Sequence, residues 1–192
     1  LKQNIKHRDV SSGNADYENR EQYTADLIHQ YALDWLDRQE AGKPFLGIFT
    51  YTLPHAELWQ PNDSILQKYI QAFECDDSGF GGAFSSWYYK NSNRHAQFAA
   101  MITRLDAQVG EIFEKLEEKG LADNTLVIFT SDNGPHEEGG ADPDWFNRDG
   151  LLRGTKRSTH EGGIRVPFIV KGPGVPAGTV NDHQLAFYDL MP

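Results

Sequence analysis

The chain has 192 residues, with 18 Lys and Arg against 28 Asp and Glu, so its formal net charge is −10. This length suits one domain with a full core, or a large part of a bigger one. The acidic excess excludes a general nucleic-acid binder, because such a protein needs basic residues to neutralise phosphates. No apolar run reaches the roughly 18 residues that a membrane span requires. The single cysteine, Cys75, excludes an internal disulfide framework.

Two amphipathic helices and three short strands are predicted. Apolar residues recur at helical spacing over residues 23–39 and again over residues 95–119. Short apolar runs typical of buried strands occupy residues 45–52, 126–130 and 166–171. A strand, a helix and a strand in succession predict a right-handed parallel crossover, so we expect an α/β fold.

The segments between these elements lack a regular period. Residues 54–92 carry prolines, glycines and scattered aromatic side chains, which either stack on a sugar ring or pack in a loop. In open α/β sheets, ligands bind beyond the carboxyl ends of the strands. The long irregular stretch 131–165 begins at such an end, so we expect it to be functional.

Asp132 and Asn133 directly follow a predicted strand and offer a carboxylate and an amide oxygen. Hard oxygen donors of this kind suit Ca²⁺ or Mg²⁺ rather than zinc. The alternative is an ordinary tight turn, since Asn-Gly is a common turn pair.

Two further side chains can act on an anionic substrate. His55 follows Pro54 just past a strand end, where an imidazole can bind an anion or protonate a leaving oxygen. Lys156 lies in the basic stretch Arg153-Gly154-Thr155-Lys156-Arg157 and can supply a point charge. Taken alone, each is more simply explained as an ordinary loop or surface residue.

The stretch from His160 to Pro167 is interpreted as structural. Its two glycines permit a sharp turn of the backbone. Glu161 and Arg165 are expected to form a buried pair that anchors the strand that follows.

Several blocks occur together and in order: Pro54-His55-Ala56, Met101-Ile102-Thr103-Arg104-Leu105-Asp106, Ser131-Asp132-Asn133-Gly134, Leu152-Arg153-Gly154-Thr155-Lys156 and Glu161-Gly162-Gly163-Ile164-Arg165-Val166-Pro167. This combination resembles the type I sulfatases of the alkaline-phosphatase-like superfamily. The resemblance runs from about Tyr23 to Pro192. It implies part of a mixed, largely parallel sheet flanked by helices.

The resemblance also implies a sulfuric ester hydrolase with a formylglycine nucleophile and a divalent cation, Ca²⁺ or Mg²⁺. Asp132 and Asn133 match two metal ligands of that family. Lys156 matches the lysine that contacts sulfate, and His55 the histidine near the sulfate or the departing sugar oxygen. His136 belongs to an extension that resembles one in bacterial carbohydrate sulfatases, so we expect it to bind substrate.

The family's nucleophile motif, Cys or Ser followed by x-Pro-x-Arg, and its first pair of metal-binding aspartates do not occur here. Cys75 is followed by Asp76-Asp77-Ser78 and does not fit the motif. We therefore expect residues 1–192 to be the C-terminal portion of a sulfatase catalytic domain, without the N-terminal nucleophile segment and the C-terminal subdomain. By itself this chain is predicted to be inactive.

The expected substrate is a sulfated carbohydrate or an aryl sulfate, and the full-length protein would need a formylglycine-generating maturation enzyme. Such enzymes are usually exported, so a periplasmic, secreted or cell-surface location is expected. Two alternatives stay open. One is a phosphoester hydrolase of the same superfamily, which the Glu161–Pro167 block disfavours. The other is a noncatalytic sugar-binding remnant.

Overall fold

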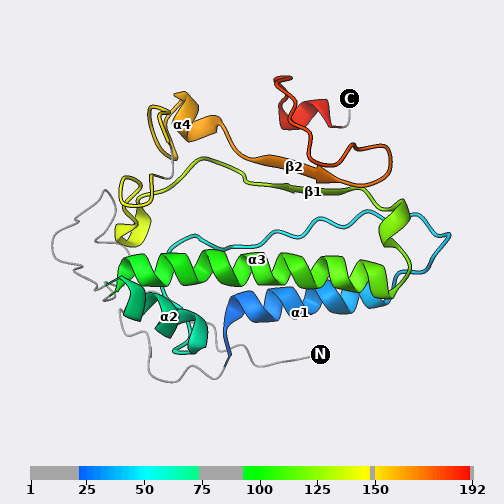
Figure 1. Cartoon of the computed structure of the whole chain (residues 1–192), viewed down its shortest axis with the longest axis horizontal. Helices are drawn as coiled ribbons and strands as arrows, with labels where there is room; N and C mark the ends of the chain where they lie inside the picture. Colours follow the sequence, from blue (N-terminus) through cyan, green and yellow to red (C-terminus); the bar gives the residue numbers. More distant parts are fainter. Residues whose placement is uncertain (1–21, 74–92, 148–149, 191–192) are drawn as a thin grey trace, which may run out of the picture.

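The computed structural model of the chain describes residues 22–73, 93–147 and 150–190 (Figure 1). Its helices are α1 (Thr24–Asp37), α2 (Ser64–Ala72), α3 (Arg94–Glu118) and the short α4 (Glu161–Ile164). Helices α1, α2 and α3 form one layer, and the strands lie on the other side of α3 (Figure 1). Within the described ranges, no helix combines the length and the apolar character needed to cross a membrane.

The predicted helices at 23–39 and 95–119 are confirmed as α1 and α3. They pack through one apolar cluster, in which α1 contributes Ala32 and Leu36 and α3 contributes Ile112 and Leu116. These residues recur at the three- or four-residue spacing that places side chains on one helix face.

Helix α2 was not predicted, since residues 54–92 read as irregular. It begins at Asp63, whose carboxylate accepts hydrogen bonds from the backbone N–H groups of Ile65 at 3.0 Å and Leu66 at 3.1 Å. An aspartate in this position satisfies amide groups that the first turn leaves unpaired. Leu66 then packs against Ala96 and Ala100 of α3, which fixes α2 on the helical layer.

The strands predicted at 126–130 and 166–171 are confirmed as β1 (Val127–Thr130) and β2 (Phe168–Lys171). They pair antiparallel, with Val127 opposite Lys171 and Thr130 opposite Phe168. Helices with this small sheet agree with the expected α/β class. Among the described residues, however, the parallel crossover is not formed.

The strand predicted at residues 45–52 is wrong. The segment is extended, but the described residues offer it no hydrogen-bonded strand partner. Phe45 and Phe49 pack edge-on against Trp35 of α1, each with ring centroids 5.7 Å apart. Leu46 and Ile48 point the other way and are 71% and 75% exposed. The apolar run is thus covered by helices on one face only.

A polar connection also holds this segment on the helices. Buried His29 of α1 lies with Nδ1 2.7 Å from the Tyr51 hydroxyl and Nε2 3.1 Å from a Glu111 carboxylate oxygen of α3. Burial, and secondarily the charge of Glu111, raise the pKa of Tyr51 to about 12. The hydroxyl therefore stays protonated and donates to Nδ1, while Nε2–H donates to Glu111.

We expect the 192-residue chain, purified by itself, to bind the dye ANS and to self-associate, because large apolar side chains such as Leu46 and Ile48 are exposed. Replacing both by Thr is expected to reduce ANS fluorescence and to shift size-exclusion elution toward the monomer. Val180→Thr, at an isolated side chain that is 93% exposed, is the control and should change neither. A wild-type chain that neither binds ANS nor self-associates would contradict the expectation.

Candidate active site

Three loops meet beyond the end of β1: residues 52–56, residues 131–138 and residues 153–158. The backbone N–H of Lys156 donates to the Pro135 carbonyl at 2.7 Å, and that of Gly134 donates to the Gly163 carbonyl at 3.0 Å. These hydrogen bonds tie the loop after β1 to the loop and turn that precede β2. Residues distant in sequence are thereby held at one edge of the structure.

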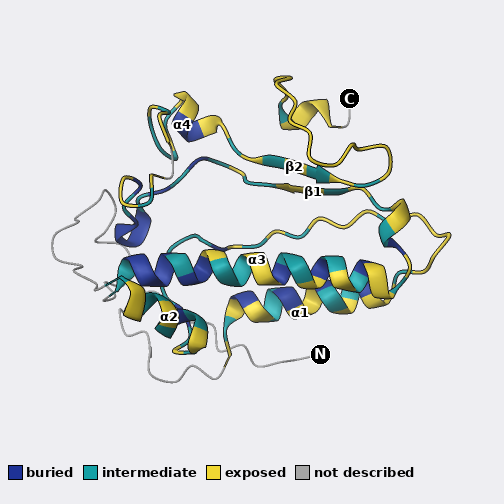
Figure 2. Cartoon of the chain, viewed as in Figure 1, coloured by how far each residue is buried: buried dark blue, intermediate teal, exposed yellow. Residues whose placement is uncertain are grey.

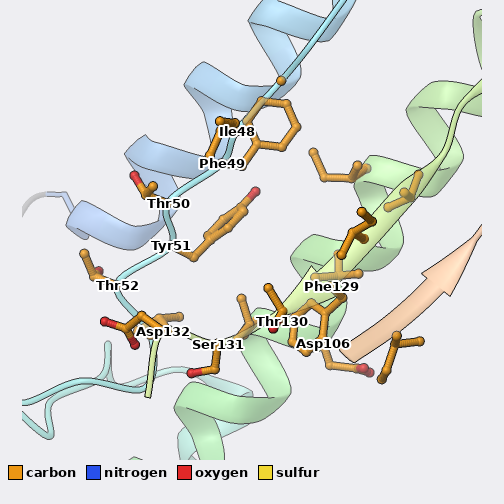
Figure 3. A pocket seen from close by; sticks show the side chains of 18 of the residues that line it. Ile48, Phe49, Thr50, Tyr51, Thr52, Asp106, Phe129, Thr130, Ser131 and Asp132 are labelled. Atoms are coloured by element: carbon orange, nitrogen blue, oxygen red, sulfur yellow. The ribbon is translucent and has the colours of Figure 1, made fainter. Parts of the chain in front are cut away.

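The loops border a large open cleft of about 2940 Å³ between the extended segment 45–52 and β1. In Figure 3, side chains of Phe49 to Thr52 line it from one side and those of Phe129 to Asp132 from the other. Ligand pockets usually measure about 300–1,000 Å³, so the whole cleft is too large for a small substrate. The candidate site is its polar end, which is lined by His55, Asp132, Asn133 and His136.

Glycine permits the close approach of these loops. A Cβ atom on Gly134 would lie 1.9 Å from the Gly162 carbonyl oxygen, and one on Gly162 would lie 2.0 Å from the Gly154 carbonyl oxygen. Neither distance is compatible with a side chain, so glycine is required at both positions. The glycines that read as a turn signal are therefore contact points between loops.

Backbone and side-chain partners fix the tautomer of His55. Its Nδ1 lies 2.8 Å from the Ala56 carbonyl oxygen, which can only accept, so Nδ1 carries the proton. Its Nε2 then accepts from the Lys156 ammonium group at 2.9 Å. Lys156 is not among the residues that line the cleft, but its positive charge lies next to the His55 ring, which does line it.

His136 is buried and lies parallel to His55, with ring centroids 5.3 Å apart. Its Nε2 donates to the Pro54 carbonyl oxygen at 2.9 Å. Its Nδ1 lies 3.0 Å from the Glu138 Oε2 atom, without the alignment of a hydrogen bond. The fold thus brings His55, Lys156 and His136 together.

Glu138 is almost fully buried and carries the negative charge of this cluster. Its Oε1 contacts the Arg157 guanidinium group and lies 3.4 Å from the Lys156 ammonium nitrogen. Burial by itself raises the pKa of Glu138, but the Arg157 hydrogen bond and the nearby charges of His136 and Lys156 outweigh it. The net effect lowers the pKa to about 2, so Glu138 is ionised.

Asp132 and Asn133 lie at the mouth of the cleft, and Asp132 is exposed. The Asn133 side-chain nitrogen donates to the Gly134 carbonyl at 2.8 Å, so its oxygen is the atom that can face a cation. Two hard oxygens fit part of a Ca²⁺ shell, which takes about 6–8 oxygen ligands. In the part of the chain that is described, no three His, Cys, Asp or Glu side chains gather as a complete metal site.

One structural expectation about this region is wrong. Glu161 and Arg165 are 63% and 68% exposed and their charged groups lie 4.0 Å apart, so they are not a buried pair. The glycines between them are buried instead and make the loop contacts.

The described aromatic residue Trp59 lies beside Tyr23 at a centroid distance of 6.1 Å, in a packing role. Of the other side chains singled out from the sequence, Cys75, Asp76-Asp77 and the aromatic residues Trp87, Tyr88 and Tyr89 lie outside the described residues.

Glu138 is a site residue that sequence reasoning missed, whereas Arg157 was noted only as part of the basic stretch 153–157. Glu137 and Glu138 are adjacent and chemically alike, and only the two glycines after Glu138 distinguish them in the sequence. The Glu137 side chain accepts from the Thr155 hydroxyl at 3.0 Å and does not share the cations of Glu138. The only available signal was an acidic residue directly before two glycines.

Cationic side chains and two hard oxygen atoms thus lie at the end of a strand in an α/β fold, an arrangement suited to binding an anion. The chain belongs to the sulfatase family, whose family model matches residues 1–192. Its structural neighbours are sulfatases, which have the alkaline-phosphatase-like fold.

Individual relatives cover different parts of the chain. An N-acetylgalactosamine-6-O-sulfatase of Bacteroides thetaiotaomicron is 44% identical over 79 residues, 38% of this chain and 16% of the relative. A Caenorhabditis elegans homolog of the extracellular sulfatase Sulf-1 is 27% identical over 192 residues, 88% of this chain and 25% of the relative. The crystal structure of Ps i-CgsB in complex with k-i-k-neocarrahexaose has a TM-score of 0.59 and 27% identity, covering 83% of this chain and 30% of that one. The chain therefore spans less than a third of the length of these relatives.

Gly162→Ala is expected to lower the free energy of unfolding by about 1–3 kcal/mol, because the added methyl group meets the Gly154 carbonyl oxygen. Gly110→Ala, inside α3 with no atom within 4 Å of the new methyl group, is the matched control. It should stabilise the protein by about 0.5–1 kcal/mol. Urea denaturation measures both changes, and equal effects of the two variants would contradict the close contact.

The ion cluster predicts how stability depends on pH. The pKa of Glu138 lies near 2 in the folded chain, below its ordinary value of 4.5. The stabilisation is therefore complete above pH 4.5 and is lost as the pH falls toward 2. We expect the stability advantage of wild type over Glu138→Gln to shrink across this window in urea denaturation. An advantage that stays constant from neutral pH to pH 2 would contradict the ionised, ion-paired carboxylate.

Proposed function

We propose that the protein containing this chain hydrolyses a sulfate monoester, on a carbohydrate or an aryl group, and that this chain supplies the anion-binding and part of the metal-binding machinery. The observation that carries the proposal is the meeting of Lys156, His55 and His136 at the cleft end that Asp132 and Asn133 border. Because the chain belongs to the sulfatase family, we interpret these side chains as a binding site for a sulfate ester.

The cationic groups bind and stabilise the anion. A sulfate monoester is negative, and charge develops on the oxygen atoms at sulfur while the ester bond breaks. The Lys156 ammonium group is held 2.9 Å from His55 Nε2 before any substrate arrives. Because the donors are already oriented, little reorganisation is needed when the charge develops.

The Lys156–His55 pair supplies the proton for the departing oxygen. The Nδ1–H of His55 is fixed by the Ala56 carbonyl, so only Nε2, which faces Lys156, can exchange a proton. When a nucleophile from outside this chain bonds to sulfur and the S–O bond of the ester breaks, the departing oxygen would take one proton from this Lys156–His55 pair. The pair is then restored by a proton from solvent.

Asp132 and Asn133 would hold a divalent cation, Ca²⁺ or Mg²⁺, together with ligands from outside the described residues. Such a cation would offset charge on the sulfate oxygens and help to ionise the nucleophile. We propose a formylglycine nucleophile, made by a maturation enzyme from a Cys or Ser outside this chain. Residues 1–192 would then be the C-terminal portion of the catalytic domain.

Two similarities support a sulfated carbohydrate as substrate. One relative is an N-acetylgalactosamine-6-O-sulfatase, and one structural neighbour was solved with neocarrahexaose. His136 would line the sugar subsite, since it stacks on His55 at the same end of the cleft. A relative named as homologous to an extracellular sulfatase supports a periplasmic, secreted or cell-surface location.

The proposal is tested with the full-length protein that contains this sequence, assayed on 4-nitrophenyl sulfate, 4-nitrophenyl phosphate and sulfated N-acetylgalactosamine. We expect sulfate-ester hydrolysis that EDTA abolishes and Ca²⁺ or Mg²⁺ restores. Lys156→Ala should lower kcat/KM by about 100-fold or more, the usual cost of losing one preorganised donor to the transition state. Lys43→Ala, at a side chain that is 72% exposed, is the control and should leave the rate unchanged.

Each contrary outcome has its own meaning. Hydrolysis of the phosphate ester alone would favour a phosphoester hydrolase. Sugar binding without any hydrolysis, and without dependence on metal, would favour a noncatalytic binding protein.

A further inference from the structure

We propose that Glu138 is a positioning residue of this site, whose buried carboxylate holds His136 as a doubly protonated imidazolium and keeps Lys156 in contact with His55. The inference rests on the proposed function only in assigning the site to an anionic ester. The protonation state of His136 follows from contacts within the chain.

Both ring nitrogen atoms of His136 lie close to an acceptor oxygen atom. Nε2 lies 2.9 Å from the Pro54 carbonyl oxygen, which has no proton to give, so Nε2 is protonated. Nδ1 lies 3.0 Å from Glu138 Oε2. An unprotonated Nδ1 would leave two acceptor atoms 3.0 Å apart at a buried position, where they would repel each other. A proton on Nδ1 turns this repulsion into an ion pair.

The two oxygen atoms of the Glu138 carboxylate face different partners. Oε2 faces His136, whereas Oε1 faces Lys156 at 3.4 Å and Arg157 at hydrogen-bond distance. The carboxylate is almost fully buried and so depends on these cations for compensation. Arg157 has φ of 76°, a conformation that side-chain-bearing residues rarely adopt, and its contact with Glu138 offsets that strain.

The other groups near the His136 ring are neutral or cationic. On one side lies the His55 ring, which is neutral because its Nε2 accepts from Lys156. Helix α3 contributes the uncharged Phe98 ring at 6.1 Å. The loop 153–158 contributes Lys156 and Arg157, both bound to the opposite carboxylate oxygen. Glu138 is thus the carboxylate in contact with His136 among the described residues.

The consequence is a cluster with a surplus of positive charge beside the polar end of the cleft. Among the described residues of this cluster, one carboxylate opposes three cationic groups, and this positive surplus attracts an anionic ester. Without Glu138 the cations would repel one another, and Lys156 would lose the partner that keeps it at His55. Glu138 thereby acts through its neighbours rather than by touching substrate.

The experiment compares Glu138→Gln, which keeps the shape and removes the charge, with the matched control Glu137→Gln in the neighbouring carboxylate. Nitrogen chemical shifts of the His136 ring, measured by NMR in the full-length protein, report its protonation as the pH is varied. We expect wild type and Glu137→Gln to carry protons on both nitrogens at pH 7, and Glu138→Gln to lose the Nδ1 proton at a clearly lower pH. Glu138→Asp, which retains a carboxylate, should restore part of the wild-type titration.

Kinetics provide the second readout. Glu138→Gln is expected to lower kcat/KM for a sulfate ester by about 10- to 100-fold, the usual effect of losing a group that orients an active-site residue. Glu137→Gln should leave the value unchanged, and Glu138→Asp should recover part of the loss.

Three results would overturn the inference: a neutral His136 in wild type at pH 7, the same titration in wild type and Glu138→Gln, or equal loss of activity in the Glu137 and Glu138 variants. The wild-type titration suffices even if Glu138→Gln does not fold. If no sulfate ester is hydrolysed while the titrations come out as expected, the proposed function fails and the ion pair between Glu138 and His136 stands.

Discussion

The burial of one carboxylate governs the arrangement of the candidate site. Glu138 is 1% exposed, and an ionised group removed from water to that degree needs cations close to both of its oxygen atoms. His136, Lys156 and Arg157 meet that need from two different loops. The same contacts bring Lys156 against His55 on a third loop. The same contacts therefore compensate the buried charge and assemble the anion-binding site.

The loops can approach so closely because the chain has glycine where they touch and a rigid layer beneath them. Gly134 and Gly162 lie where any side chain would collide with a neighbouring carbonyl oxygen. Below the cleft, α1 and α3 pack through aliphatic side chains and hold the extended segment 45–52 through Trp35 and His29. His55 follows that segment directly, so the helical layer determines where the imidazole lies.

The cleft itself has two chemically different parts. Its polar end suits an anionic ester and a hard cation, whereas segment 45–52 and β1 line the cleft with apolar side chains such as Ile48 and Phe129. Figure 2 shows β1 and β2 coloured as exposed or intermediate. A sulfatase site as we propose it also needs a nucleophile and further metal ligands. Asp132 and Asn133 supply two metal-binding oxygen atoms and no nucleophile. In the proposed site, the nucleophile and the remaining metal ligands come from outside the described residues. This agrees with a chain that spans less than a third of the length of its sulfatase relatives.

The sequence alone determined the family, the two long helices, both strands of the sheet and the residues expected to bind sulfate and metal. Local periodicity and ordered motifs indicate these features, and both can be recognised without knowing which distant residues are in contact. Only the tertiary structure decided that residues 45–52 bury one face, that Asp63 begins a helix whose Leu66 packs on α3, and that Glu161 and Arg165 stay exposed. It also distinguished Glu138 from Glu137. Two adjacent carboxylates are equivalent in sequence, and which of them is buried depends on cations 18 and 19 residues further along the chain, brought near by the folding of the loops.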